Sequence, residues 1–293
     1  MKITLMVSAF LLLFVTGCKE LKLSEIDFNN ITAEDIQKGI SFGQRVYDAS
    51  KDLTPEQEYY IGRSVAASVL AKYKVYDNKG LNNYINTVGT LLTLNSEKPE
   101  IFGGYHFAVL DSSEVNAFAT PGGFIFITKG MLKLCKNEDE LAAVLAHEIS
   151  HVQLRHGISS IKDSRWTAIG TLLATSATKK YGTQELASLT ESFEDSIGDI
   201  VNTLVVNGYS REYEMQADQY ALNILNKTGY VDFSMVSMLN TMQSVLKNDK
   251  RGFGATHPQA SERIESINSL IKQPSAVVNK TRTKRFQLYY KYV

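Results

Sequence analysis

The chain has 293 residues, 44% of them hydrophobic, and its 31 basic and 31 acidic side chains give a formal net charge of zero. A chain of this length can bury a sizeable core without the help of disulfides. The balanced charge shows no sign of nucleic-acid binding, so we expect no nucleic-acid partner.

The first residues look like a bacterial export signal. Lys2 supplies a positive start, and residues 3–16 form a mostly apolar stretch that is too short for an ordinary membrane span. The stretch ends before Cys18 in a pattern that resembles a lipobox, so we predict that 1–17 is a lipoprotein signal peptide and that Cys18 is lipid-modified. The alternative is a buried cysteine in a leader. Lipidation would leave only Cys135, so no intramolecular disulfide is expected.

A tether and two helices are predicted next. Residues 18–50 have weak helical patterning and are expected to form a lipid-anchored tether. Thr54 begins a strong helix start, because proline follows at the first helical position and Gln57 completes a capping box. Apolar periodicity then predicts one helix over about 55–74 and another over about 81–94.

Two short strands are predicted after these helices. The first covers residues 105–110. The second covers residues 124–128, where a run of Phe and Ile follows Pro-Gly-Gly, a sequence typical of a turn followed by a strand. Because the chain has no internal repeat, we expect a single α+β domain over 51–273.

Residues 147–151 read His-Glu-Ile-Ser-His, the H-E-x-x-H arrangement of zinc hydrolases. Residues four apart lie on one face of a helix, so His147 and His151 can reach the same metal ion. Glu148 can then hold the attacking water and accept its proton. The alternative is a pair of surface histidines that match the pattern by chance.

The flanking residues predict a buried helix over 138–156. Asn137 is a good N-cap, and Glu140 completes a capping-box pattern. His156 falls in the last turn, where a cation suits the helix dipole, and Gly157 suits the position after the helix.

A catalytic zinc usually has three protein ligands. One class of zinc peptidases has a third histidine at the position of Gly157, so the third ligand must come from elsewhere.

The best candidate for the third ligand lies in residues 210–218. Ser210 can cap a helix that ends near Gly229, and Glu214 and Asp218 project from one face of it. Glu214 would bind the metal, and Asp218 would accept the free ring N–H of a ligating histidine. The alternative is a solvated acidic helix face.

Residues 158–208 are rich in Ser, Thr and small apolar residues. Their apolar part, residues 166–177, is too short and too polar to span a membrane. We expect this region to be either a lid or helical hairpin over the cleft, or an ordinary packing element. Residues 230–272 are predicted to form two further helices.

Two features near the C-terminus have open roles. His257 precedes Pro258, which restricts its backbone. We expect it either at the rim of the active site, where it would contact the tetrahedral intermediate or control access to zinc, or at a helix entry with no catalytic role. Residues 274–293 mix basic and aromatic side chains and are expected to form a solvated tail, with contact to a membrane or a sheet edge as the alternative.

Taken in this order and spacing, these segments resemble the M48 family of zinc metallopeptidases, which includes Ste24-type, Oma1-type and bacterial periplasmic proteases. The resemblance extends over most of the mature chain and shows no departure at a metal-binding or catalytic position. The matching segments are residues 115–123, 125–130, 143–156, 210–218, 256–258 and 262–263.

The resemblance implies Glu214 as the third zinc ligand, in a mostly helical zincin-like α+β domain with a small sheet. It also implies that an edge strand borders the zinc cleft and pairs with an extended substrate through main-chain hydrogen bonds. Asn116, Ala117 and Phe118 are the expected substrate-binding residues. The alternative is an ordinary core hairpin.

We therefore expect a zinc metalloendopeptidase with one Zn²⁺ per chain, held by His147, His151 and Glu214. Glu148 is the expected general base, and His257 is a further candidate catalytic residue. The expected substrates are unfolded or misassembled cell-envelope proteins. The alternative is a lipid-anchored chaperone or assembly factor that holds such proteins and has a latent or structural zinc site.

The Cys18 lipid anchor predicts attachment to a membrane of the bacterial cell envelope. Lys19 rather than aspartate follows this cysteine. By resemblance to lipoprotein sorting in enterobacteria, we expect the outer membrane, with the domain facing the periplasm.

Overall fold

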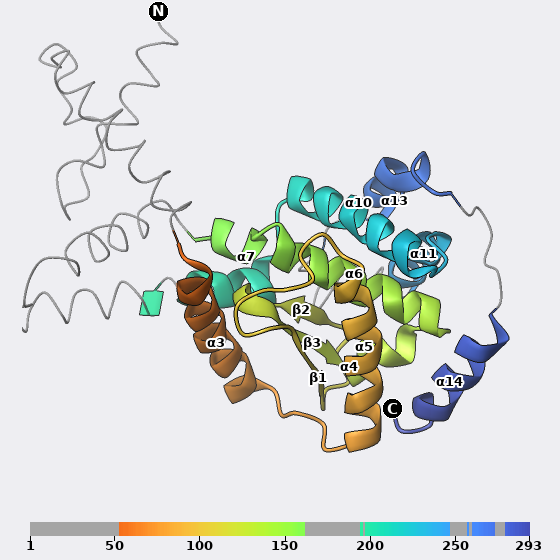
Figure 1. Ribbon diagram of the computed structural model, residues 1–293, viewed down its shortest axis with the longest axis horizontal. Helices are drawn as coiled ribbons and strands as arrows, with labels where there is room; N and C mark the ends of the chain where they lie inside the picture. Colours follow the sequence, from red (N-terminus) through yellow and green to blue (C-terminus); the bar gives the residue numbers. More distant parts are fainter. Residues whose placement is uncertain (1–52, 162–193, 196, 247–256, 258–259, 273–278) are drawn as a thin grey trace, which may run out of the picture. The chain divides into compact units, whose positions relative to one another are not determined.

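A three-stranded mixed sheet packs against helix α6 (Glu138–Gln153) in the computed structural model (Figure 1). The sheet contains β1 (His106–Leu110), β2 (Ala117–Ala119) and β3 (Phe124–Thr128), in the order β1-β3-β2. Strand β1 runs parallel to β3, and β2 runs antiparallel to it. The two strands predicted from the sequence are confirmed, and β2 forms an outer edge of the sheet.

The structure describes residues 53–161, 194–195, 197–246, 257, 260–272 and 279–293. The other helices are α3 (Pro55–Lys72), α4 (Lys79–Leu94), α5 (Lys129–Leu134), α7 (His156–Ser159), α10 (Arg211–Thr228), α11 (Phe233–Leu246), α13 (Ala260–Asn268) and α14 (Lys280–Tyr290). The structure also contains a 3-10 turn, η3 (Pro121–Gly123), and a π-helical turn, η4 (Thr203–Asn207). These elements belong to one unit of residues 54–161 and 197–293. The predicted mostly helical α+β class is confirmed.

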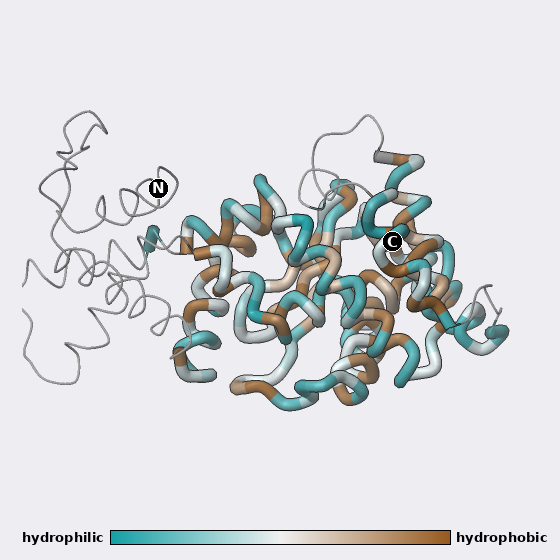
Figure 2. The backbone as a smooth tube through the Cα atoms, turned by 90° about the horizontal axis from the view of Figure 1, so that it is seen from above, coloured by the Kyte–Doolittle hydropathy of each residue, from teal (hydrophilic) through white to brown (hydrophobic). Residues whose placement is uncertain are grey.

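Capping side chains begin the helices where the sequence predicts. The Thr54 hydroxyl accepts the Gln57 N–H at 3.2 Å, and the Gln57 side chain accepts the Thr54 N–H at 2.9 Å. Asn78 and Ser210 cap α4 and α10, and α10 ends at Gly229 in the left-handed conformation. Hydrophobic and hydrophilic residues alternate along the helices in Figure 2, as expected for helices with one buried face. The helices predicted here are confirmed, as are the two within 230–272, which are α11 and α13.

Helix α6 is buried along its whole length and contacts α10, α11, α4 and β2. Asn137 accepts the Glu140 N–H at 2.8 Å, and the Glu140 carboxylate accepts the Lys136 N–H at 2.8 Å. The helix ends at Gln153 rather than at the predicted residue 156. The helix ends there because Arg155 adopts the left-handed conformation with φ of 59° and turns the chain into α7.

The far edge of β1 is covered by α4. The side-chain oxygen of Asn82 accepts the Val109 N–H at 3.0 Å, and the side-chain amide of Asn86 donates to the Phe107 carbonyl at 2.7 Å. The Tyr76 N–H also donates to the Val109 carbonyl at 2.7 Å. Because these groups occupy main-chain positions that another strand would need, this edge is closed to strand addition.

The C-terminal segment is a docked helix, and the solvated tail predicted from the sequence is wrong for residues 279–293. Phe286 of α14 is buried in the core, and Tyr289 stacks on Tyr84 with ring centroids 4.4 Å apart. Arg285 donates hydrogen bonds to both carboxylate oxygens of Glu138 at the start of α6. The physical reason is the burial of Glu138, whose charge needs a cationic partner that a distant part of the chain supplies.

Some predicted features lie outside the described residues. They include the signal peptide at 1–17, the lipidation of Cys18, the tether at 18–50 and the apolar segment at 166–177. These remain predictions. Among the described residues, no helix combines the length and the apolar character needed to cross a bilayer.

Candidate metal centre

Four side chains that can bind a metal converge in one buried cluster. His147 and His151 project from α6, Glu214 projects from α10, and His257 precedes α13 in the sequence. Their ligand atoms all lie within 4.8 Å of one another, and none of the four residues is more than 8% exposed. The structure therefore brings together the three predicted zinc ligands and His257.

The separations within this cluster fit a metal ion. The Nε2 atoms of His147 and His151 are 3.0 Å apart, and the Glu214 carboxylate oxygens lie 3.5 and 3.4 Å from these two atoms. Metal bonds of about 2.0–2.2 Å place the ligands of a tetrahedral ion roughly 3.3–3.6 Å apart. Oε1 of Glu214 has no hydrogen-bond donor among the described residues, which is rare for a buried carboxylate. Two imidazoles and one carboxylate suit zinc, so these residues fit that ion.

Glu148 lies beside the cluster and is placed for proton transfer. Its carboxylate accepts the backbone N–H of Ala119 in β2. Burial raises the pKa of Glu148 to about 7, and its Oε1 has no hydrogen-bond partner among the described residues. A carboxylate with a pKa near neutrality can both accept and release a proton under ordinary conditions.

His147 is supported on its far side by an ion pair. Its Nδ1 lies 2.9 Å from Oδ1 of Asp218, and Arg263 donates to the Asp218 carboxylate from Nε and Nη2 at 2.7 Å each. Burial acts to raise the pKa of Asp218, but Arg263 and His147 outweigh it and hold the pKa at about 2. The ionised Asp218 can accept the Nδ1–H of His147 and leave Nε2 facing the cluster. Asp218, one helical turn after Glu214 on α10, therefore lies against His147.

His151 has different surroundings. Its Nδ1 lies 2.8 Å from Nδ1 of His156, and its ring stacks on Tyr209 with centroids 4.3 Å apart. His156 is only 1% exposed, and burial lowers its pKa to about 4. The expectation that His156 acts as a cation in the last turn of the motif helix is wrong, because α6 ends before it and burial keeps the ring neutral.

His257 lies against the ligands rather than at a solvated helix entry. Its Nδ1 is 2.8 Å from Oε2 of Glu214 and 3.4 Å from Nε2 of His147. Its chain neighbours, Thr256 and Pro258, lie outside the described residues. Of the two roles that the sequence left open, this geometry supports one at the metal site.

Strand β2 lies next to Glu148 and carries two of the three predicted substrate-binding residues, Ala117 and Phe118, while Asn116 directly precedes it. The main-chain bonds that flank the strand join it to β3 at Asn116 and Thr120. Because bonded residues alternate in an antiparallel pair, the main-chain groups of Ala117 and Ala119 point away from β3, and those of Phe118 point toward it. The main-chain groups at the outer edge are therefore those of Ala117 and Ala119. Ala119 was not among the predicted substrate-binding residues.

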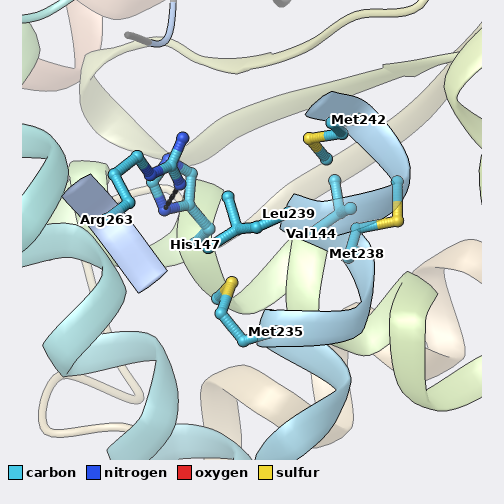
Figure 3. A pocket seen from close by; sticks show the side chains of 7 residues that line it. All are labelled: Val144, His147, Met235, Met238, Leu239, Met242 and Arg263. Carbon is cyan, nitrogen blue, oxygen red and sulfur yellow. Dashed lines mark hydrogen bonds between the residues drawn. The ribbon is translucent and has the colours of Figure 1, made fainter. Parts of the chain in front are cut away.

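A small pocket adjoins His147 on the side of α11, and Figure 3 shows the Arg263 guanidinium against the imidazole. Nη2 of Arg263 lies 3.3 Å from Nδ1 of His147. The pocket is lined by Val144, His147, Met235, Met238, Leu239, Met242 and Arg263. The apolar wall lowers the local dielectric, which strengthens the ion pair between Arg263 and Asp218.

The sequence assigned no role at the metal cluster to three residues of the site, which are Arg263, Tyr209 and His156. Arg263 matched the family-like C-terminal segment, and its signal is its spacing, since it lies four residues before the buried Ile267 on the same face of α13. Tyr209 and His156 carry no local signal. Their contacts with His151 depend on how α7 and α10 meet α6.

The sequence of the chain is similar to those of several known proteases. The model of a protein family described as peptidase family M48 matches residues 81–271. The β-barrel assembly-enhancing protease of Yersinia pestis is 26% identical over 234 residues, which are 77% of this chain and 46% of the relative. Metalloprotease YcaL of Escherichia coli (strain K12) is 29% identical over 166 residues, 57% of this chain and 62% of the relative. The mitochondrial metalloendopeptidase OMA1 of Saccharomyces cerevisiae is 26% identical over 188 residues, 60% of this chain and 49% of the relative. The chain spans about half the length of several of these relatives.

Proposed function

The chain belongs to peptidase family M48, and on that premise we propose that it is a zinc-dependent endopeptidase that hydrolyses peptide bonds in unfolded or misassembled cell-envelope proteins. The observation that carries this proposal is the buried cluster of His147, His151 and Glu214, with Glu148 beside it. One carboxylate oxygen of Glu214 and one of Glu148 have no hydrogen-bond donor among the described residues. A metal ion and a reacting water would each require such an oxygen.

In the proposed mechanism, His147, His151 and Glu214 hold the metal through Nε2 atoms and a carboxylate oxygen. A bound zinc ion supplies a Lewis acid and lowers the pKa of water toward about 7. Glu148 takes the proton of the attacking water at its carboxylate and delivers it to the nitrogen of the leaving amine. A pKa of about 7 suits both halves of that transfer.

Strand β2 supports binding of an extended substrate. We infer that a polypeptide aligns along its outer edge, where the main-chain groups of Ala117 and the carbonyl of Ala119 point away from β3, while the Ala119 N–H is bonded to Glu148. Main-chain recognition of this kind favours unfolded chains and accepts many sequences. Asn116 and Phe118 would then support the strand, since Phe118 is buried and its ring packs near Phe126.

The position of His257 favours a second candidate, a latent enzyme. Structural zinc sites are usually closed by four protein ligands, whereas catalytic sites keep one position open. With His257 as the fourth ligand at rest, the protein would hold unfolded envelope proteins without cleaving them until His257 moves away. The chaperone-like alternative and the protease would then be two states of one site.

The proposed location is the bacterial cell envelope. We infer a lipid anchor at Cys18 after removal of residues 1–17, a tether over 18–50 and attachment to the outer membrane with the domain in the periplasm. The names of the bacterial relatives, which refer to β-barrel assembly, support envelope proteins as substrates.

The test is degradation of an unfolded protein by wild type and by Glu148→Gln, each with and without a chelator. We expect cleavage by the metal-loaded wild type alone. Cleavage by Glu148→Gln at the wild-type rate would refute the mechanism. If the zinc-loaded wild type cleaves nothing, cleavage by His257→Ala would support latency, and no cleavage by either protein would refute the peptidase.

A further inference from the structure

The two histidines of the metal cluster are supported by different groups. His147 faces the anionic Asp218, whereas His151 faces another histidine, His156, through Nδ1 atoms 2.8 Å apart. A hydrogen bond between two ring nitrogens needs one N–H and one bare nitrogen. The direction of this bond therefore decides which nitrogen of His151 is left to bind a metal.

The amide of Gln216 sets that direction. Its Oε1 lies 3.2 Å from Nε2 of His156, and its Nε2 donates to the Glu212 carboxylate at 3.3 Å. A flipped amide would turn its oxygen toward the Glu212 carboxylate, so Glu212 holds the amide oxygen toward His156. That oxygen accepts only a hydrogen, so the proton of His156 lies on Nε2 and its Nδ1 is bare.

We propose that His156 is a positioning residue that accepts the Nδ1–H of His151 and thereby leaves the Nε2 electron pair of His151 for the metal, with Gln216 orienting His156. This inference rests on the proposed function only in taking His151 as a metal ligand. The opposite arrangement would put the proton of His151 on Nε2, where it would block metal binding.

Aromatic contacts hold both rings in this geometry. His156 stacks on Tyr213 with centroids 4.3 Å apart and planes 7° apart, and His151 stacks on Tyr209 with planes 17° apart. These contacts oppose ring rotation, so the Nδ1 atoms stay within hydrogen-bond distance.

The left-handed turn at Arg155 is what makes the contact possible. In a continuous helix, residues five apart are rotated by roughly 140° and do not face each other. Because α6 ends at Gln153 and the chain turns at Arg155, His156 returns to the face that carries His151. The early end of the helix is thus part of the site.

The direct test uses the zinc-loaded full chain with ¹⁵N-labelled histidine and long-range ¹H–¹⁵N correlation spectra, which show which ring nitrogen carries a proton. We expect the proton of His151 on Nδ1 and that of His156 on Nε2. A proton on Nδ1 of His156 would overturn the proposal.

Variants test the same inference through zinc affinity, measured by competition with a chelator. His156→Leu should weaken zinc binding by about 10–100-fold, the usual effect of losing a group that supports a ligand. Gln216 is only partly buried and offers a matched pair that is safer for folding. Gln216→Glu keeps an acceptor for His156 and should retain the tautomers, whereas Gln216→Met removes it and should produce mixed tautomers of His156.

The outcomes separate this inference from the proposed function. A protein that shows the expected tautomers but degrades no polypeptide, even as His257→Ala, would refute the peptidase and leave the role of His156 standing. A protein that degrades polypeptides while His156→Leu binds zinc as tightly as wild type would refute the role of His156 and leave the peptidase standing.

Discussion

The two ends of α6 both bury charged side chains, but they satisfy them differently. At the start of the helix, Glu138 accepts hydrogen bonds from two tyrosine hydroxyls and from Arg285, so both of its oxygens are used. Toward the other end, Glu148 and the facing Glu214 each keep one oxygen without a donor among the described residues. The same helix therefore carries a fully satisfied buried carboxylate and an incompletely satisfied one.

This difference indicates that the start of α6 anchors the helix, whereas the end that carries Glu148 takes part in the proposed chemistry. An unsatisfied buried acceptor costs about 1–3 kcal/mol, so a folded protein retains one where a ligand or a proton uses it. The complete set of bonds at Glu138 fixes the helix against α14 and α4. The other end of α6 can then carry carboxylate groups whose oxygens are left to bind a metal or a reacting water.

The largest effect is expected for Glu148→Gln, which removes proton transfer while keeping the shape of the side chain. Turnover of an unfolded protein should fall by about 10²–10⁴-fold, the usual contribution of general acid–base catalysis. Metal content and melting temperature should stay at wild-type values. The exposed Glu56→Gln is the control and should retain full activity.

Glu214→Ala should weaken zinc binding by more than about 100-fold, because loss of a direct ligand exceeds the ~10–100-fold effect of a supporting group. Metal content after dialysis against a weak chelator measures this change. Glu262→Ala is the matched control, since Glu262 pairs with Arg211 at the surface at 3.1 Å and such pairs contribute little. Full metal content in Glu214→Ala would reject Glu214 as a ligand.

Arg285→Met tests the anchored end. It removes the cationic partner that Glu138 has among the described residues, and because Arg285 is exposed we expect a loss of about 2 kcal/mol in the free energy of unfolding. That loss should lower the melting temperature by roughly 4–8 °C, with zinc affinity unchanged. The exposed Lys284→Met on the same helix should have no effect. A loss of zinc affinity as large as that of Glu214→Ala would show that the two ends are not independent.

The smallest effect is expected for Ser237→Ala, which removes the 2.7 Å hydrogen bond from the Ser237 hydroxyl to Oε1 of Glu140. Glu140 still accepts the Lys136 N–H, so the loss should be about 1 kcal/mol. Chemical denaturation measures it. A change in turnover without a change in stability would contradict the separation of the two ends.

Much of the fold and part of the site were predictable because their signals are local. The caps at Thr54, Asn137 and Ser210 lie within one turn of the helices that they begin, and all three side chains cap as expected. The predicted capping box at Asn137 is wrong, because the Glu140 carboxylate accepts the Lys136 N–H instead of the Asn137 N–H. The position of β3 also followed from a short run of Phe and Ile after a turn sequence. The end of α6 did not follow, because no local rule favours Arg155 over Gly157 for the left-handed position.

The sequence by itself determined that His147, Glu148 and His151 share one helix and that both histidines lie on one face of it, because helical spacing alone decides this. Only the tertiary structure decided that Glu214 and His257 meet these histidines, that Arg263 supports Asp218 and that His156 supports His151. It also decided that α14 docks on the start of α6. Local geometry repeats within a few residues, whereas these contacts join distant parts of the chain and form only when the whole core is packed.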